Sequence, residues 1–485
     1  MQPRTQEFSK LAARALGDTQ VQKALLGLQT GFDQARQRAI LELTPEAWDR
    51  LRDRAREIRR HTLERLDYYV GLLADNVVRN GGAVHFARDA HEAAQIVLDI
   101  ARRNGVKLAV KGKSMVSEEM ALNHLLAANG VEALETDLGE YIIQLAGETP
   151  FHIVAPAIHK SQEEVAELFA RKLGTPEGAD AEALTRIARE TLRQKFLQAG
   201  MGISGVNFAI AETGTVCIVT NEGNGRMSTS LPPIHVALMG MEKVTPALED
   251  LGVFYRLLPR AATGQRATSY FTLVSGPRRN EDEDGPEQFH LVMMDNGRSR
   301  LLADPELREA LFCIRCGACL NACPVYRKVG GHAYGWVYPG PIGAVVTPAM
   351  VGLPKAVALP FASTLCGACR EVCPVKINIP RMLLKLRADA VEGAPGQRKA
   401  SWYEGLTFRA WGRLMRSERT LARARGVAVF LQRPFSRDGW LQKMPLPLFY
   451  RWTRGRDFPT LARRSFHELW EDELRTSSPQ VPPLR

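Results

Sequence analysis

Seven of the eight cysteines lie within 61 consecutive positions, in two motifs of nearly the same form. The first motif runs from Cys313 to Pro324 and has the spacing C-x2-C-x2-C-x3-C-P, which is typical of proteins that hold cubane iron–sulfur clusters. Its two-residue spacers let a tight loop point three thiolates at one cluster, whereas the fourth cysteine points at another. The motif therefore predicts iron–sulfur chemistry and electron transfer.

The second motif, from Ser363 to Pro374, aligns with the first except that Ser363 stands where the first motif has a cysteine. In two-cluster ferredoxins the last cysteine of each motif serves the cluster of the other motif. This rule predicts four thiolates for one cluster and three for the other. The predicted ligands are Cys313, Cys316, Cys319 and Cys373 for cluster 1, and Cys323, Cys366 and Cys369 for cluster 2.

The missing thiolate leaves the type of cluster 2 open. Its fourth iron corner is held by Ser363, by water or by another subunit, or the corner is absent, as in a three-iron cluster. A serine oxygen is a harder ligand than a thiolate, so it would make the corner labile or change the potential. The sequence favours a serine that is merely a small residue beside an open corner. Cluster 1 is expected to be 4Fe-4S, and cluster 2 either 4Fe-4S or 3Fe-4S.

Zinc is the main alternative for so many cysteines. It needs four ligands per site, usually in paired C-x2-C steps, whereas here two such steps follow one another and both motifs end in Cys-Pro. The remaining cysteine, Cys217, lies in the apolar run Thr215–Val219 and is expected to be a small buried hydrophobe. The single histidines His235 and His332 are expected to be structural.

A second site is conceivable in the middle of the chain, where polar clusters follow or interrupt predicted strands. No G-x-G-x-x-G follows a strand, and Gly112-Lys113-Ser114 lacks the earlier glycine of a phosphate loop, so no nucleotide site is predicted. Loops beyond strand ends are where α/β folds bind ligands. A small acid would use Lys113 and Arg226, with Glu212 as the general base. Ordinary turn chemistry explains the same residues and is favoured.

Four regions are expected to position these residues. Strand and helix patterns alternate in the middle of the chain, which predicts an α/β domain with a largely parallel sheet. The cysteines fall in a Gly- and Pro-rich segment that predicts a loop-rich, ferredoxin-like module. The regions are an N-terminal helical region (1–80), the α/β domain (81–300), the cysteine module (301–390) and a Trp/Arg-rich C-terminal domain (391–485).

The expected elements follow from hydrophobic periodicity and from start and stop signals. Thr44 before Pro45 is a good helix start, with threonine as the cap and proline in the first turn. The expected strands are Ala83–Ala87, Lys107–Val110, Val131–Glu135, Phe151–Ala155, Asn207–Thr220, Ile234–Met239, Ser269–Val274 and Gln288–Met294. The expected helices are Ala90–Arg103, Ser117–Ala128, Glu163–Leu173, Ala181–Leu197 and Arg381–Val391.

Composition and charge predict a cytoplasmic protein with a basic tail. There is no secretory signal and no run of 18 apolar residues. Residues 391–485 carry 18 Lys and Arg against 9 Asp and Glu, most of the net charge of +11, together with five of the seven tryptophans. Such a surface suits an acidic partner or anionic lipid, or is simply solvated. We expect no nucleic acid partner, and we consider contact of the tail with the inner face of the membrane.

The cysteine motifs with their flanks, Cys313–Tyr326 and Leu365–Pro380, resemble those of the lactate utilization protein B family. The resemblance extends to Glu212–Thr215, to Asn221–Arg226 and to the Trp/Arg-rich tail. It implies an α/β domain related to the CoA-transferase and ribose-phosphate-isomerase group, followed by a helical ferredoxin module like that of succinate dehydrogenase. It also implies seven cysteine ligands and an electron carrier that works with two sister proteins in oxidising L-lactate to pyruvate.

Three hypotheses about function follow. In the first, the chain is an electron-transfer subunit that takes electrons from a partner subunit and passes them through two clusters to a quinone or another carrier. In the second, it is itself a catalytic subunit that binds the small acid near Lys113, Glu212 and Arg226. In the third, it is a scaffold in which the clusters are purely structural.

Overall fold

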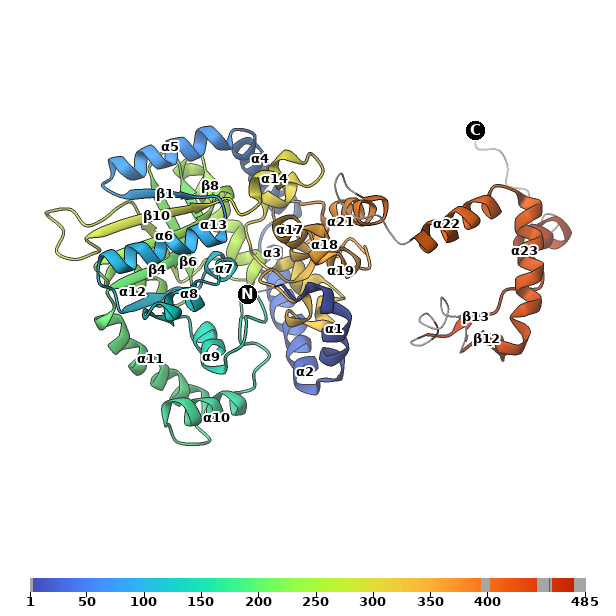
Figure 1. Cartoon of the computed structure of the whole chain (residues 1–485), viewed down its shortest axis with the longest axis horizontal. Helices are drawn as coiled ribbons and strands as arrows, with labels where there is room; N and C mark the ends of the chain where they lie inside the picture. The colour runs from blue at the N-terminus through green and yellow to red at the C-terminus, as the bar shows by residue number, and fades with distance from the viewer. Residues whose placement is uncertain (1–2, 394–401, 443–452, 454–455, 475–485) are drawn as a thin grey trace. The chain divides into compact units, whose positions relative to one another are not determined.

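The chain divides into two compact units, residues 1–398 and residues 399–485. The first unit contains the α/β sheet and the cysteine module (Figure 1). Among the described helices, none is both long enough and apolar enough to cross a membrane. The residues that the computed structural model describes are 3–393, 402–442, 453 and 456–474.

A six-stranded sheet, parallel throughout, forms the centre of the first unit, as predicted for this part of the chain. Its strand order is β1-β10-β7-β4-β2-β3. The carboxyl ends of the strands therefore share one edge, where ligands bind in such folds. The strands are β1 (Ala83–Ala87), β2 (Leu108–Lys111), β3 (Glu132–Glu135), β4 (Met201–Gly205), β7 (Ile234–Gly240) and β10 (Gln288–Met294).

Both faces of this sheet are covered, which explains its near-continuous apolar strands. In β7, Val236 and Leu238 pack toward α6, whereas Ala237 and Met239 pack toward α5. Figure 1 shows α5 and α6 on different sides of the strands. The helices are α5 (Leu66–Arg79), α6 (Ala90–Arg103), α7 (Met115–Glu119), α8 (Leu122–Ala128), α9 (Leu138–Ala146), α10 (Gln162–Leu173), α11 (Ala181–Gln198), α12 (Asn224–Ser230), α13 (Leu248–Ala262) and α14 (Arg298–Ala303).

A second, four-stranded sheet has the order β8-β5-β6-β9. The strand predicted over Asn207–Thr220 is in fact two antiparallel strands of this sheet, because the chain turns at Gly214, whose φ of 68° suits glycine. The strands are β5 (Phe208–Ile210), β6 (Thr215–Thr220), β8 (Val244–Thr245) and β9 (Tyr270–Val274).

Two further predictions about elements were wrong. The helix predicted over Ser117–Ala128 is broken into α7 and α8 at Ala121, whose φ of 50° is left-handed. The segment Phe151–Ala155 is not a strand: it is a loop that packs on the cysteine module instead of pairing with a sheet. A Cβ atom on Gly331 would lie 1.7 Å from the carbonyl oxygen of Phe151, so the loop and the module touch backbone to backbone.

The N-terminal helices pack in the same hydrophobic core as the cysteine module. Thr44 caps α4 as predicted, accepting a hydrogen bond from Ala47 N at 3.2 Å. Helix α1 lies beside α16 (Tyr326–Val329) of the cysteine module, and Figure 1 shows α1 and α2 next to helices of this module. The N-terminal helices are α1 (Phe8–Gly17), α2 (Thr19–Leu28), α3 (Gln34–Leu41) and α4 (Pro45–Glu64).

The cysteine module is more helical than its glycines and prolines suggested. Its longest helix, α17, spans Gly340–Val351 and has proline in its first turn, where no N–H is lost from the helix. The helix predicted at Arg381–Val391 is found as α21 (Ile379–Ala388). The other helices are α15 (Ala318–Ala322), α16 (Tyr326–Val329), α18 (Leu353–Ala356), α19 (Ala358–Phe361) and α20 (Ala368–Glu371).

Several large apolar side chains of the second unit are exposed to solvent. Phe408, Trp411 and Phe430 are each more than half exposed, at 65%, 59% and 64%. Trp452 of the predicted Trp/Arg stripe lies outside the described residues. The elements of this unit are α22 (Trp402–Met415), α23 (Glu418–Leu431), β11 (Ser436–Arg437), β12 (Trp440–Leu441), β13 (Phe458–Pro459) and α25 (Phe466–Leu469).

Candidate iron–sulfur centres and a neighbouring cavity

The two cysteine motifs share one local backbone geometry. Cys316 lies between Arg315 (φ 61°) and Gly317 (φ 78°), and the corresponding pair in the second motif is Leu365 (φ 56°) and Gly367 (φ 88°). Left-handed backbone is costly for a residue with a side chain. Its use at equivalent positions of both motifs therefore marks a turn that the motif requires. A short helix, α15 or α20, begins directly after each turn.

Four thiols line one small cavity beside the first turn, three from the first motif and one from the second. Backbone N–H groups two and four residues further along donate to Cys313 Sγ and Cys373 Sγ, both at 3.4 Å. The walls of this cavity include several isoleucines, so the thiols meet in apolar surroundings. The sulfur-bearing residues of its lining are Cys313, Cys316, Cys319 and Cys373, the four predicted for cluster 1.

The thiols of Cys323, Cys366 and Cys369 form a second group. Burial, and then the nearby Cys323 and Cys366, raise the pKa of the Cys369 thiol to about 12, so the three sulfurs lie within electrostatic reach. Burial and then neighbouring thiols, Cys369 among them, raise the pKa of Cys319, which places the two groups side by side. Cys366 is exposed to solvent, whereas Cys323 and Cys369 are buried.

Ser363 occupies the place in the second motif that Cys313 has in the first. Its Oγ accepts a hydrogen bond from Leu365 N at 3.1 Å, just as Cys313 Sγ accepts one from Arg315 N at 3.4 Å. The serine is half-buried. The oxygen therefore lies on the same side of the same turn as the thiolate it replaces.

The donors fit iron–sulfur clusters. Burial raises the pKa of the Cys316 and Cys319 thiols well above the ordinary range and raises that of Cys373 to about 11. Several thiolates cannot share such a site without a cation, because their charges repel and burial disfavours each of them. Iron supplies the compensating charge when a cluster is bound. All eight cysteines are free thiols, as this role requires.

A larger cavity, the strand-end cavity, lies beside the cluster 1 thiols at the carboxyl ends of β2, β4 and β6. Of the three residues predicted for a small-acid site, Lys113 lines it and donates to the carbonyl of Val154 at 2.8 Å. Glu212 and Arg226 do not line it. Glu212 is exposed and accepts the Leu248 N–H at the start of α13, at 3.1 Å.

The neighbouring Lys111 has a structural role. It is 1% exposed, and its ammonium lies 2.6 Å from Glu135 Oε1 and 3.2 Å from Glu118 Oε1. These carboxylates hold the pKa of Lys111 above its ordinary value in spite of its burial. Ser114 caps α7 by accepting from Ser117 N at 3.3 Å. Beside Lys113, therefore, Lys111 and Ser114 serve ordinary packing and turn chemistry.

Three family models match successive parts of the chain. They are the LUD domain at residues 70–294, the 4Fe-4S dicluster domain at residues 309–377 and the lactate utilisation protein B C-terminal region at residues 385–475. The dicluster match spans all seven cysteines of the two motifs.

Curated relatives match along nearly the whole chain. Lactate utilization protein B of Bacillus licheniformis is 44% identical over 97% of this chain and 98% of its own length. Its counterparts in Shouchella clausii and Bacillus thuringiensis are 44% and 43% identical, covering 96% and 97% of this chain and 96% and 98% of their own. The chain belongs to the lactate utilization protein B family. A solved structure of a DUF162 family protein from Deinococcus radiodurans covers 47% of this chain and 98% of its own, at 12% identity and a TM-score of 0.28.

Arginines of the N-terminal helices, which the sequence did not single out, bind the second cysteine motif in this member of the family. Arg36 donates to Val372 O at 3.2 Å, and Arg52 donates to Cys373 O at 3.0 Å. Arg56 donates to a carbonyl three residues beyond Cys373, at 2.6 Å. Arg52, Arg56 and Arg59 recur at helical spacing on α4, a pattern that marks one basic face of the helix but not the carbonyls that it binds.

A buried ionic network joins the sheet to the first cysteine motif. Arg298 lies between Glu119 (2.8 Å) and Glu242 (2.5 Å), and all three side chains are at most 1% exposed. Arg315 lies 3.7 Å from the other oxygen of Glu242 and 4.3 Å above the ring of Tyr338. The hydroxyl of Tyr338 bonds Glu119, which closes the network. The turn that carries Cys316 is therefore fixed to the sheet.

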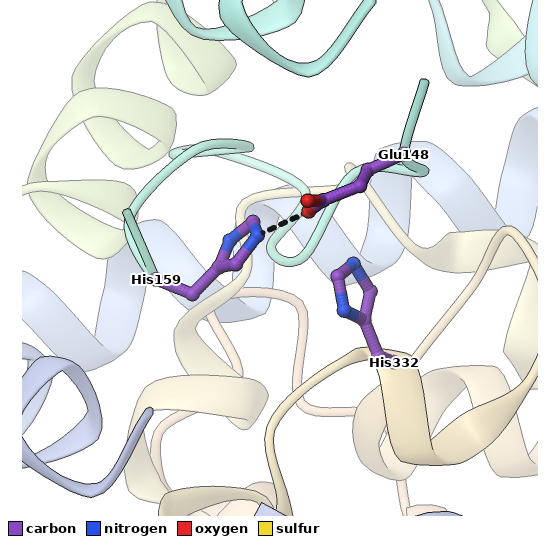
Figure 2. A group of neighbouring side chains, drawn as sticks. All are labelled: Glu148, His159 and His332. Atoms are coloured by element: carbon purple, nitrogen blue, oxygen red, sulfur yellow. Dashed lines mark hydrogen bonds and ion pairs between the residues drawn. The ribbon is translucent and has the colours of Figure 1, made fainter. Parts of the chain in front are cut away.

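A second polar group ties the loop before α10 to the cysteine module (Figure 2). His159 Nε2 bonds Glu148 Oε2 at 2.8 Å, and Lys160 also pairs with Glu148. His332 Nε2 donates to Thr149 O at 2.7 Å. Figure 2 shows the three labelled side chains converging from different segments. Lys160 already neutralises the carboxylate of Glu148. These hydrogen bonds therefore connect the loop to the module, which is a structural role, as expected for His332.

Cys217 lies away from both thiol groups, inside the core formed by β5 and β6. It is 0% exposed, and burial alone raises the pKa of its thiol. We therefore expect Cys217→Ala to keep its full iron and sulfide content, with a loss of only about 1 kcal/mol of stability for the small buried volume removed. Iron analysis of the reconstituted variant, beside Cys316→Ala as the positive control, checks this. Iron loss in Cys217→Ala would refute its assignment to the core.

Proposed function

We propose that this chain carries electrons in the utilization of lactate, through two iron–sulfur clusters. The single observation that supports this most is the gathering of seven thiols into two adjacent groups within one module. The names of the curated relatives supply the metabolic context. In this proposal cluster 1 is 4Fe-4S. Cluster 2 is either 4Fe-4S, with Ser363 Oγ as the protein atom beside its fourth iron corner, or 3Fe-4S, in which that corner is absent.

Oxidation of a 2-hydroxy acid to the keto acid releases two electrons and two protons. When bound, the clusters supply one-electron transfer. The chain's own residues shield the cluster 1 thiols in an apolar cavity and leave Cys366 exposed at the second group. We therefore place the exchange with an outside carrier at cluster 2, and the hydroxy-acid chemistry on a partner subunit. The chain acts as a carrier subunit rather than as an enzyme by itself.

The partners in this proposal are two sister lactate-utilization proteins, and the acceptor is a quinone or another carrier. The exposed Phe408, Trp411 and Phe430, set among arginines, support contact of the second unit with a partner or with an anionic membrane surface. The six-stranded parallel sheet with helices on both faces supports placing the α/β part in the CoA-transferase and ribose-phosphate-isomerase group.

Redox titration of the full chain tests the proposal. Anaerobically reconstituted protein is expected to be brown and to hold about seven or eight iron ions and about eight sulfide ions per chain. Two EPR signals should appear and disappear reversibly as the potential is changed. Colourless protein that binds two zinc ions, or clusters that keep one oxidation state throughout, would contradict it.

A further inference from the structure

The strand-end cavity has a volume of about 390 Å³, within the range of small-molecule sites in proteins. It shares Ile153, Arg315 and Cys316 with the cavity that gathers the cluster 1 thiols. The two cavities are thus separated by a single layer of side chains. Anything bound in the first lies against the turn that carries Cys316.

Two cations face the cluster end of the strand-end cavity with unused hydrogen-bond donors. Lys243, which follows β7, is 7% exposed and lines the cavity, yet its ammonium has no hydrogen bond or ion pair to any described residue. Arg315 has its Nη1 group buried without a described partner. A buried hydrogen-bond donor without an acceptor is costly even where its charge is compensated, as the charge of Glu242 compensates both cations here. An anion in the cavity would supply acceptors to both residues.

The acids that line the cavity are already engaged. Asp137 caps α9 by accepting from Glu140 N at 3.1 Å, and Glu222 accepts from Leu138 N at 3.2 Å. Asn224 also lines the cavity; it is 6% exposed, and its Oδ1 has no described donor. The lining of the cavity therefore includes two cations with unused donors and a free acceptor, which suits an anion that also carries a hydroxyl group.

We propose that the strand-end cavity binds a small organic carboxylate with a hydroxyl group, its carboxylate on Lys243 and Arg315 and its hydroxyl donating to Asn224. The ligand then lies directly against the cluster 1 turn. This inference rests on the proposed function only in taking cluster 1 to be present. It assigns a ligand site to the α/β part of this chain, formed by residues other than the Glu212 and Arg226 of the sequence hypothesis.

Binding is tested on the full chain with reconstituted clusters under anaerobic conditions. Calorimetric titration with L-lactate, with propionate (the same carboxylate without the hydroxyl) and with inorganic phosphate separates the chemical classes. L-Lactate is expected to bind most tightly and to change the EPR spectrum of reduced cluster 1. Its negative charge beside the cluster disfavours reduction, so the potential of cluster 1 is expected to fall on binding.

Lys243→Met is the decisive variant, because it removes an ammonium that has no hydrogen bond to a described residue, while Arg298 still pairs with the nearby Glu242. We expect its dissociation constant for L-lactate to rise at least about tenfold, the effect of losing one charge-assisted hydrogen bond, at unchanged iron content. Lys23→Met, at an exposed position on α2, is the matched control and should bind as the unmodified chain does. Asn224→Ala should weaken binding of L-lactate and leave that of propionate unchanged.

Several outcomes would overturn the assignment. These are no lactate-dependent heat or EPR change in protein with full iron, tighter binding of phosphate than of L-lactate, and a Lys243→Met variant that binds as the unmodified chain does. If Lys243→Met loses iron, the test rests on Asn224→Ala. Weaker binding of L-lactate and of propionate by the same factor in Asn224→Ala would count against the contact between the hydroxyl group and Asn224. Clusters that cannot be reduced would refute the proposed function while the calorimetry still reports binding, so the two failures are distinguishable.

Discussion

Cys373→Ala is expected to abolish cluster 1, whereas Cys369→Ala, only four residues earlier, is expected to abolish cluster 2. The thiol of Cys373 lines the cavity of the first motif, and that of Cys369 lies with Cys323 and Cys366. Each variant should therefore lose about half of the iron and one of two EPR signals, because each cluster needs its own thiolates.

Single variants in the first motif show which cysteines of the two motifs belong to the same cluster. Cys316→Ala should lose the same signal as Cys373→Ala, and Cys323→Ala the same signal as Cys369→Ala. Spectra are recorded on reduced and oxidised protein, with iron and sulfide counted on the same samples. If Cys316→Ala and Cys323→Ala lose one signal, and Cys369→Ala and Cys373→Ala lose the other, then each motif binds its own cluster and the crossed arrangement is wrong.

The grouping of the seven thiols could be predicted because the geometry of each motif is mostly local. A spacing of two residues, with glycine after Cys316 and Cys366, leaves few ways for the chain to turn, and the structure has the same left-handed turn at both places. The crossed assignment of Cys373 came from the ferredoxin rule, and the structure brings Cys373 to the first group. What local spacing could not give is the surroundings: the apolar walls of one group and the exposure of Cys366.

The elements that were missed depend on close approach between segments far apart in the chain. Strand β4 reads as Met-Gly-Ile-Ser-Gly, and its two glycines weaken any strand signal. The structure explains one of them, since a Cβ atom on Gly202 would lie 1.7 Å from Ser228 O. Conversely, Phe151–Ala155 has the composition of a strand, but its partner is the cysteine module. Periodicity reports which side chains are buried, not what covers them.

The polar surroundings of the site could not be predicted from the sequence either, because they also depend on contacts between segments far apart in the chain. Arginines on a helix such as α4 are normally solvated, and only the fold shows that Arg52 and Arg56 bind carbonyls more than 300 positions away. In the strand-end cavity Lys113 could be suspected from its place after a strand. Lys243 and Arg315 could not, because no spacing links them and each follows a different structural element.

Arg298→Met is expected to lower the stability of the first unit by about 3–5 kcal/mol, the usual result when one partner of a buried ion pair is removed. Arg298 is the only described cation that bonds both Glu119 and Glu242. Its loss leaves Glu119 without an ion pair to any described residue and leaves Glu242 with the 3.7 Å pair to Arg315 and the charge of Lys243, which does not bond it directly. Arg60→Met is the matched control: its ion pair with Glu64 has side chains 55% and 52% exposed, so it should cost at most about 0.5 kcal/mol.

The measurement is the urea midpoint of the loaded protein under anaerobic conditions, with the cluster 1 EPR signal followed in parallel. Despite its burial, Glu242 keeps its pKa at about 2, because the charges of Arg298 and other cations favour the carboxylate. Its contribution to stability is therefore present above the unfolded value of about 4.3 and is lost only as the pH falls toward 2. Adding Glu119→Gln and Glu242→Gln to Arg298→Met removes the unpaired charges and should recover part of the loss. A single variant no less stable than Arg60→Met would show that the network does not hold the Cys316 turn against the sheet.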